Sequence, residues 1–362
     1  MKHLARATLA LALLSAVILG ACTAGPLGIF ESLSLETPVD NGTEAFSGLT
    51  PNFVVRLGAD YYAGVGTLWK RPVGGGAWNP VPGTPDGMLA TSAATDGSAL
   101  FVLFTDGDSS VVKEWDGSAW APDLATTGIG TMKPDALHYA DTTLFLSVGA
   151  TDTEADPDVT SANIHSGLGF ATAAFATAPT GGIVKALVHD SLTYYSAHAD
   201  DVYSGDADAG GLTTMALQPA IGTVTALLAR GADVVVAAGA SGSVAVWDGS
   251  AWTPHVIDSA AYLSDLVEVP AHGGGTVILA AARGFGTKVA RGYYEVSPLD
   301  WSVNEDHDLV TTTTNYQTTL EDLGIVECFW DAADGILFAC TVGDGLWSNH
   351  WNGTSWSGWN RE

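Results

Sequence analysis

The sequence predicts an all-β protein folded as a seven-bladed β-propeller of four-stranded antiparallel blades. Three observations lead to this prediction: a hairpin motif that recurs along the chain, short apolar runs that precede each copy, and a nearly regular spacing of the repeats. The predicted propeller occupies residues 46–362. A single domain of this length is reasonable for a repeat protein, because each blade packs only on its neighbours.

The hairpin motif occurs twice letter for letter and once with conservative changes. Its copies are Trp115-Asp116-Gly117-Ser118-Ala119-Trp120, Trp247-Asp248-Gly249-Ser250-Ala251-Trp252 and Trp351-Asn352-Gly353-Thr354-Ser355-Trp356. Asp-Gly and Asn-Gly tolerate the positive φ that a tight hairpin turn requires. With a four-residue loop, the two tryptophans of a copy face each other across the ladder and stabilise it by roughly 0.5–1 kcal/mol.

Short apolar runs supply the other strands of each unit. The copy at Trp247 follows three of them, at residues 224–229, 234–238 and 242–246. Comparable runs lie at residues 53–57, 61–65, 66–70, 77–78, 99–104, 110–115, 144–148, 183–188, 192–195, 263–269, 277–281, 325–330 and 336–341. Runs rich in β-branched and aromatic residues between Gly, Asp and Asn clusters are typical of strands. No stretch shows a sustained helical period.

One aromatic or apolar anchor closes each unit, and seven anchors predict seven blades. They are Trp78, Trp120, Phe170, Leu212, Trp252, Trp301 and Trp356, with a mean spacing of about 46 residues. This spacing lies between the ~40–45 residues of WD40 repeats and the ~50 of kelch repeats. Together with the hairpins, it resembles bacterial β-propellers of the kelch-like and Asp-box-like kind. The motif departs from the true Asp-box, because Asp248 and Gly249 are adjacent. The resemblance implies an architecture and no particular activity.

The first 21 residues are predicted to be an export signal. Lys2 and Arg6 precede an apolar run, 7–18, that is too short for a stable bilayer span. The segment ends in Leu19-Gly20-Ala21-Cys22, which resembles the lipobox of bacterial lipoproteins. The resemblance implies lipid attachment at Cys22, and Thr23 after it resembles cargo sent on to the outer membrane. An ordinary cleaved secretion signal is the alternative.

Residues 22–45 are predicted to form a flexible tether between the lipid and the propeller. Residues 29–35 could instead add an edge strand to the closing blade. Removal of residues 1–21 takes the formal net charge from −27 to −29. Such a body is repelled by nucleic acid and by anionic lipid surfaces, and nucleic acid is therefore excluded as a partner. The acidic excess favours solubility, and we expect a monomer.

Two cysteines, Cys328 and Cys340, remain in the predicted propeller. A three-residue loop, 333–335, with Gly335 at its left-handed position would place the two cysteines opposite each other in a hairpin. Export provides an oxidising compartment. We therefore predict a Cys328–Cys340 disulfide, with two buried free thiols as the alternative.

No catalytic residue, cofactor or metal site is predicted. The chain lacks a nucleophile elbow, a histidine pair with zinc spacing and a complete phosphate loop. Asp206 and Asp208 have the alternating spacing of a calcium loop but lack its later glutamate, so they are only weak metal candidates.

The predicted role is a non-catalytic, membrane-anchored module of the cell envelope that binds a protein or a glycan. One alternative is a glycan-active hydrolase, which needs two carboxylates at the channel mouth. Another is an assembly factor resembling the propeller lipoprotein that helps outer-membrane proteins fold. A carboxylate pair with aromatic neighbours would favour the enzyme. A large exposed apolar patch on one face would favour a protein partner.

Overall fold

The computed structural model describes residues 46–124, 133–140, 143–149, 164–166, 171–172, 184–190, 193–198, 201–206, 211–214, 219–231, 234–288, 290–304, 307–310 and 320–362. All of them belong to the compact unit Gly42–Glu362. In this described part no helix is long and apolar enough to cross a membrane. The predicted signal peptide, the lipidation site Cys22 and the tether lie outside the described residues.

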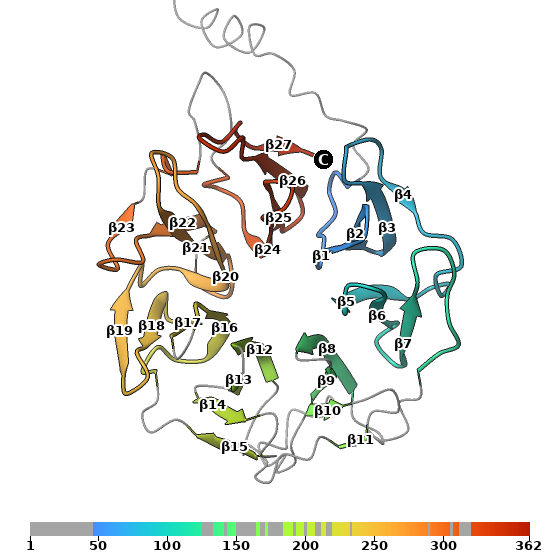
Figure 1. The fold of residues 1–362 in the computed structure, drawn as a ribbon, viewed down its shortest axis with the longest axis horizontal. Helices are drawn as coiled ribbons and strands as arrows, with labels where there is room; N and C mark the ends of the chain where they lie inside the picture. Colours follow the sequence, from blue (N-terminus) through green and yellow to red (C-terminus); the bar gives the residue numbers. More distant parts are fainter. Residues whose placement is uncertain are drawn as a thin grey trace, which may run out of the picture. The chain divides into compact units, whose positions relative to one another are not determined.

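Seven antiparallel sheets surround a common axis, and each is built from one continuous segment of the chain (Figure 1). Blades 1 to 3 are formed by β1 (Val54–Leu57), β2 (Asp60–Val65), β3 (Thr67–Pro72) and β4 (Asn79–Pro80); β5 (Leu89–Thr95), β6 (Leu100–Thr105) and β7 (Ser110–Trp115); and β8 (Lys133–Ala140), β9 (Thr143–Gly149), β10 (Ile164–Ser166) and β11 (Ala171–Thr172). Blades 4 and 5 are formed by β12 (Val184–Asp190), β13 (Thr193–His198), β14 (Asp201–Asp206) and β15 (Gly211–Thr214); and β16 (Val224–Ala229), β17 (Val235–Gly239), β18 (Ser243–Trp247) and β19 (Trp252–Val256). Blades 6 and 7 are formed by β20 (Tyr262–Pro270), β21 (Thr276–Arg283), β22 (Gly292–Val296) and β23 (Val303–Asn304); and β24 (Ile325–Asp331), β25 (Ile336–Thr341), β26 (Gly345–His350) and β27 (Asn360–Arg361).

The prediction of an all-β, seven-bladed propeller is confirmed. Six sheets have four strands. In blade 2, isolated bridges from Trp115 to Trp120 and from Val112 to Leu124 stand where the fourth strand would be. The first strand of each blade lies nearest the axis in Figure 1, and the later strands follow outward in chain order. The anchors Trp252 and Leu212 lie in outermost strands, whereas Phe170 is outside the described residues.

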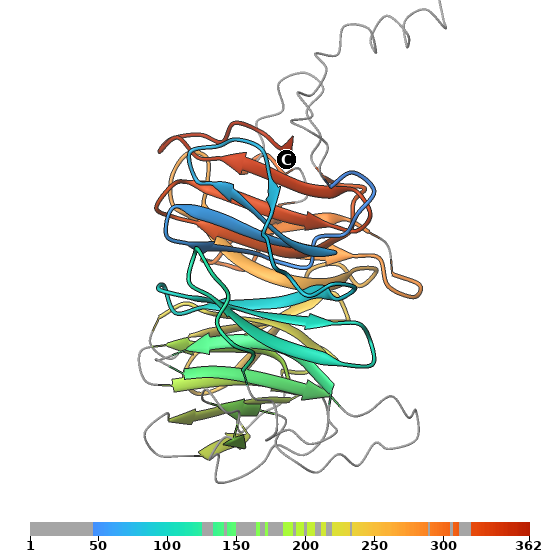
Figure 2. The ribbon, with the colours of Figure 1, turned by 90° about the vertical axis from the view of Figure 1, so that its right-hand side faces the viewer.

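Alternating strand direction defines two faces of the propeller, which Figure 2 shows edge-on. The turns between second and third strands lie on the same side as the connections between blades, and we call this side the upper face. The turns between first and second strands and between third and fourth strands lie on the opposite side, the lower face. Because the strands of each described blade alternate in direction, the position of a turn in the strand order gives the face on which it lies.

The hydrophobic core lies between neighbouring blades, because both faces of each sheet are covered. In β25, Phe338 and Cys340 belong to the cluster shared with blade 1, whereas Leu337 and Ala339 belong to the cluster shared with blade 6. All six residues of this strand are buried. The alternation follows from the two-residue period of a strand, and burial of both faces explains the continuous apolar runs in the sequence.

The predicted runs match most of the observed strands, and the inner strand of blade 2 is the clearest omission. β16 and β25 occupy the predicted residues 224–229 and 336–341. β5 was not predicted, because its sequence Leu-Ala-Thr-Ser-Ala-Ala-Thr lacks the bulky β-branched and aromatic residues that mark strands.

The tryptophans of each hairpin motif face each other across the ladder, as predicted. Trp247 pairs with Trp252, and their ring centroids are 5.7 Å apart. In the other two copies the corresponding distances are 5.0 and 5.4 Å. The glycine that follows the Asp or Asn has a φ of 95° at Gly117, 89° at Gly249 and 96° at Gly353.

The aspartate of the motif has a second role that the sequence reading did not assign. Asp116 Oδ1 accepts hydrogen bonds from the N–H groups of Ser118 and Ala119, both at 2.7 Å. Asp248 forms the same turn, and Asn352 does so with its amide oxygen. Asp96-Gly-Ser-Ala99 repeats it between β5 and β6. The recurring Asp-Gly-Ser-Ala sequence could have indicated this turn.

The predicted Cys328–Cys340 disulfide is wrong: both thiols are free and buried. The hairpin loop has four residues instead of three, since Asp331 pairs with Ile336. Cys328 consequently lies opposite Ala339, and Cys340 lies opposite Glu327. Because a one-residue change of register moves a side chain to the other face of a sheet, the two cysteines belong to different core clusters.

Among the described strands none is exchanged between blades 1 and 7, and residues 29–35, the predicted alternative edge strand, lie outside the described residues. The segment before β1 attaches to blade 7, where the N–H of Gly345 donates to the carbonyl of Leu49 at 3.0 Å. The buried ring of Phe46 packs 5.5 Å from Trp69 and 5.4 Å from Trp78. Trp78 Nε1 in turn donates to Glu362 at 3.1 Å.

Candidate functional site

A cavity of about 290 Å³ opens along the axis of the propeller, between the innermost strands. Its walls come from blades 3 to 7 and mix aliphatic with polar side chains. The polar side chains that line it include those of His138, Thr225, Ser264, Asp265 and Glu327. The cavity therefore brings together two carboxylates from neighbouring blades that the sequence analysis did not select.

A repeated irregularity of the inner strands places these carboxylates. β5, β8, β12, β16, β20 and β24 each contain a bulge near the upper end. The residues that follow the bulge are, in blade order, Ser92, Ala136, Ala186, Ala226, Asp265 and Glu327. Blades 3 to 5 have alanine at this position, and its small side chain takes up little space near the axis. Blades 6 and 7 place an acidic side chain there instead.

The polar residues that follow the bulges join one blade to the next. Asp265 Oδ2 accepts the N–H of Cys328 in blade 7 at 2.7 Å, and Asp265 Oδ1 accepts the N–H of Leu266 at 2.8 Å. Glu327 accepts a hydrogen bond from the N–H of Val54 in blade 1. The carboxylates thus connect blades 6, 7 and 1 at the axis, and a structural role accounts for their positions.

Burial changes the protonation of the groups around the cavity. Burial raises the pKa of Asp265 to about 6, against the lowering effect of the Cys328 and Leu266 N–H groups. Burial also raises the pKa of Glu327, and the nearby charge of Asp265 raises it further. Desolvation lowers the pKa of His138 to about 4, so this imidazole is neutral at pH 7.

Two coupled carboxyl groups with raised pKa values are one requirement of acid–base chemistry. A glycan hydrolase would in addition need an aromatic surface on which a sugar ring can stack. Apart from the His138 imidazole, the residues that line the cavity have no aromatic side chain. The cavity therefore has the carboxyl pair that a glycan hydrolase needs, but it lacks an aromatic surface on which a sugar ring can stack.

Exposed apolar side chains gather on the upper face. Six large hydrophobic side chains are exposed among the described residues. Five of them lie in turns or strand ends of the upper face: Leu49, Leu89, Val256, Phe285 and Val342. The sixth, Leu299, lies on the lower face between β22 and β23 and is 93 % exposed.

Three of these residues lie over adjacent blades 1, 7 and 6, and we call Leu49, Val342 and Phe285 the apolar arc. Leu49 and Val342 are adjacent because the segment of Leu49 bonds to the β25–β26 turn. A Cβ added at Gly324 would lie 3.2 Å from Val342 and 3.4 Å from the backbone of both Arg283 and Gly284. Val342 therefore approaches the turn that carries Phe285.

The upper face of blade 6 also contains a small polar cavity of about 100 Å³. It is lined by Asp258, Arg291, Tyr294, His307 and Glu321. The Tyr294 hydroxyl donates to Asp258 at 2.5 Å, and this hydrogen bond is the main cause of the lowered pKa of Asp258. His307 has a φ of 55°, an uncommon conformation for a residue other than glycine.

The weak metal candidates stay untested predictions. Asp206 ends β14, and Asp208 lies outside the described residues. No group of three or more His, Cys, Asp or Glu side chains is arranged to hold a metal among the described residues. The Trp-Asp-Gly turns lie on the lower face, opposite the apolar arc.

Comparisons with known proteins identify the fold. No family model and no curated protein matches the sequence. YCF48 bound to D1 peptide is similar with a TM-score of 0.59 and 10 % identity, over 84 % of this chain and 92 % of that one. The extracellular domain of the one-component system BT4673 of B. thetaiotaomicron has a TM-score of 0.59 and 11 % identity, over 84 % of this chain and 38 % of that one. A chain of the mitotic checkpoint complex has a TM-score of 0.58 and 13 % identity, over 86 % and 95 %.

These likenesses place the chain among the β-propellers. At such low identity they show the fold alone, and function has to be argued from the residues of the site. The chain spans less than half of the BT4673 structure that it matches.

Proposed function

We propose that the protein is a lipid-anchored component of the cell envelope whose propeller binds a protein partner through its upper face. In this proposal the lipid at Cys22 holds the protein at a membrane, which we infer to be the outer membrane. The propeller acts as a rigid, non-catalytic scaffold, and loops of one face make the contacts. Repetition suits this role, because adjacent blades present their turns side by side.

The observation that carries this proposal is the one-sided distribution of exposed apolar side chains. Isolated exposed hydrophobic residues are normal on any protein surface. Five of six on one face, three of them over adjacent blades, are what a protein interface presents before its partner binds. Phe285 is 61 % exposed and Val342 is 50 % exposed, so both are available for contact.

The fold relatives are compatible with such a role. One is described as bound to a peptide and another as part of a checkpoint complex. Each description concerns that protein and not this chain. They support the proposal only by showing that a propeller of this form can carry a polypeptide on its surface.

Lipidation is tested by labelling cells with a palmitate analogue. We expect the full-length chain to incorporate the label and to sediment with membranes. We expect Cys22→Ser to lose the label and to leave the membrane fraction, because a short signal sequence alone does not anchor a mature protein. An unlabelled wild-type chain, or a Cys22→Ser chain that stays in the outer membrane, would contradict the anchor.

Partner binding is tested by capture from a detergent extract of the envelope. We expect the tagged full-length chain to capture a specific protein. The double variant with Phe285→Ser and Val342→Ser should capture at least tenfold less of this protein. One well-buried contact residue is worth about 1–2 kcal/mol, or about tenfold in affinity. Leu299→Ser is the matched control, since it removes an equally apolar and more exposed side chain from the lower face. Equal loss in both variants would contradict the assignment of the face.

The glycan-active hydrolase is the second candidate, and the Asp265–Glu327 pair is the observation in its favour. The same preparation is applied to a glycan array and to chromogenic glycosides. We expect neither binding nor turnover. Hydrolysis that is abolished by Asp265→Asn would show that the protein is an enzyme and would contradict the non-catalytic scaffold. Capture of unfolded outer-membrane proteins would identify the partner class of an assembly factor.

A further inference from the structure

The cations of blade 6 differ from every other described cation in the propeller. Nine Lys and Arg side chains are described. Six of them form ion pairs with carboxylates: Arg56, Lys70, Arg71, Lys113, Arg230 and Arg361. The other three are Arg283, Lys288 and Arg291, and none forms an ion pair with a described carboxylate. All three lie between the end of β21 and the start of β22, on the upper face.

This arrangement is unusual for a chain with forty acidic and thirteen basic residues. Where acidic side chains are so abundant, a cation has many opportunities to find one nearby. Asp258 and Glu321 line the same cavity as Arg291, and the charges of Arg291 and Lys288 help to lower the pKa of Asp258. Among the described residues, none of the three cations is within ion-pair distance of these carboxylates, so the turn presents a local excess of positive charge on a negative body. Opposite charges on a binding surface and its partner accelerate association and select the partner.

Aromatic rings hold the first of these cations in place. The Arg283 guanidinium lies 4.9 Å from the ring centroid of Tyr262 and 5.7 Å from that of Phe285. The two rings lie 5.1 Å apart. Arg283 Nε is buried and has no hydrogen-bond partner among the described residues. A guanidinium restrained in this way loses less conformational freedom when it binds a carboxylate.

The other two cations extend the positive site along the turn. Lys288 Nζ donates to the carbonyl of Ser259, which holds the turn against the connection between blades 5 and 6. Arg291 lines the small polar cavity described above and is exposed. The site thus runs from Phe285, in the apolar arc, to the cavity at Arg291.

We propose that Arg283, Phe285, Lys288 and Arg291 form a binding site for an acidic peptide segment of the partner protein. The inference rests on the proposed function, because it specifies the chemistry of the segment that the upper face binds. Carboxylates of the segment pair with the arginines and the lysine, and an adjacent apolar side chain packs on the exposed ring of Phe285. Arginine binds carboxylates through two parallel hydrogen bonds, which gives both energy and geometry.

The experiment measures fluorescence anisotropy of labelled peptides with the full-length protein in neutral detergent. One probe alternates Glu and Leu and has an amidated C-terminus. A second replaces every Glu by Gln, a third is the Gln peptide with a free C-terminal carboxylate, and a fourth replaces Glu by Lys. The first and third probes distinguish side-chain carboxylates from a terminal carboxylate as the bound group.

We expect a carboxylate-bearing probe to bind, the amidated Gln and Lys probes not to bind, and added salt to weaken binding. Arg283→Gln and Arg291→Gln should each weaken binding about tenfold, the effect of one charge-assisted hydrogen bond. Lys70→Gln is the matched control, because it removes the same charge from a paired site of blade 1. If Arg283→Gln disturbs folding, the inference is tested with Lys288→Gln and Arg291→Gln alone.

Two results would overturn the inference. One is binding of the acidic probe that Arg283→Gln, Lys288→Gln and Arg291→Gln leave unchanged. The other is absence of peptide binding, whether or not the protein binds vesicles of phosphatidylglycerol. If the peptides fail while envelope capture still depends on Phe285 and Val342, the proposed function stands and only the acidic character of the segment is wrong.

Discussion

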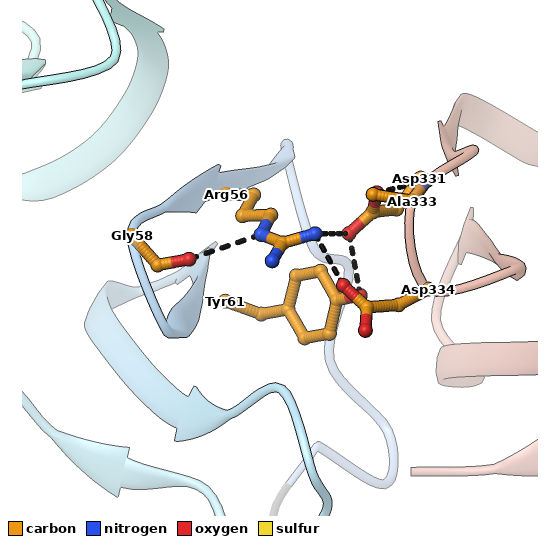
Figure 3. A network of polar contacts seen from close by, with 6 residues as sticks. All are labelled: Arg56, Gly58, Tyr61, Asp331, Ala333 and Asp334. Carbon is orange, nitrogen blue, oxygen red and sulfur yellow. Dashed lines mark hydrogen bonds and ion pairs between the residues drawn. The ribbon is translucent and has the colours of Figure 1, made fainter.

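Replacement of Asp331 by alanine is expected to lower the free energy of unfolding by about 3 kcal/mol, the scale of breaking a buried charged network. Asp331 is 7 % exposed and joins blade 7 to blade 1 (Figure 3). Its carboxylate accepts the Tyr61 hydroxyl at 2.7 Å, Arg56 at 2.7 Å and the N–H of Ala333 at 3.0 Å. Without it, the buried Tyr61 hydroxyl loses its acceptor, and Arg56 keeps only Asp334 and the carbonyl of Gly58.

The protonation of this network agrees with that role. Burial alone would raise the pKa of Asp331, but the hydrogen bonds donated by Tyr61, Ala333 and Arg56 outweigh it and leave the pKa below its ordinary value. For an acid with a lowered pKa, stability is present above the unfolded pKa and is lost as pH falls through the folded pKa. The contribution of Asp331 is therefore complete at neutral pH.

Urea titration monitored by tryptophan fluorescence measures this loss. Asp334→Ala is the matched control, since Asp334 also contacts Arg56 but is 34 % exposed and lies at the surface of the same turn. Its loss should cost less than about 1 kcal/mol. Equal destabilisation by the two variants would show that the network does not close the ring.

Stability is expected to fall as pH rises from about 5 to 8, and Glu295 is one of the described groups that cause this fall. Its side chain is fully buried in β22. Burial raises the pKa of Glu295 to about 7, although the N–H groups of Leu309 and Val310 act in the opposite direction. Those groups donate to the carboxylate at 3.1 and 2.8 Å, and Asn304 donates at 2.9 Å.

The sign follows from proton linkage. Between the unfolded pKa of 4.5 and the folded pKa of about 7, the folded state retains a proton that the unfolded state has released. Stability contributed by such a group is present below the unfolded pKa and is lost as pH rises through the folded pKa. Each unit of pKa difference is worth about 1.4 kcal/mol, so Glu295 alone accounts for roughly 3 kcal/mol. Asp265 and Glu327 shift in the same direction.

Urea titrations across this pH range test the expectation. Glu295→Gln removes the ionisable group. Between pH 5 and 7, the slope of its unfolding free energy against pH should therefore differ from that of the wild type by the equivalent of about one proton. Asp116→Asn is the comparison, because hydrogen bonds from Ala119 and Ser118 lower the pKa of Asp116 and its contribution is lost only in acid. An unchanged slope in Glu295→Gln would show that this carboxyl group titrates normally in the folded protein.

The architecture was predictable because its signals are local. Turn chemistry at Asp248-Gly249 and the apolar runs before it depend on residues that are close in sequence, and their repetition along the chain indicates blades. The same logic did not reach the inner strand β5, whose small residues resemble a loop. It also gave the wrong loop length at Gly335, and with it the wrong partners for Cys328 and Cys340.

The sites were not predictable in the same way. Asp265 and Glu327 look like ordinary strand residues in the sequence, and only the bulges of β20 and β24 turn both toward one cavity. Phe285 and Val342 are single apolar residues in separate turns. They become a surface only because both turns join second and third strands and so reach the upper face.

The sequence by itself determined the repeated all-β blades and the hairpin turns within them, whereas the export signal stays a prediction. Each of these depends on contacts or recognition within a few dozen residues. Tertiary structure alone decided that Cys328 and Cys340 lie in different core clusters, which carboxylates share the axis and which described cations form no ion pair. The physical reason is that register, strand direction and blade order act over the whole ring, and a one-residue shift reverses the face on which a side chain lies.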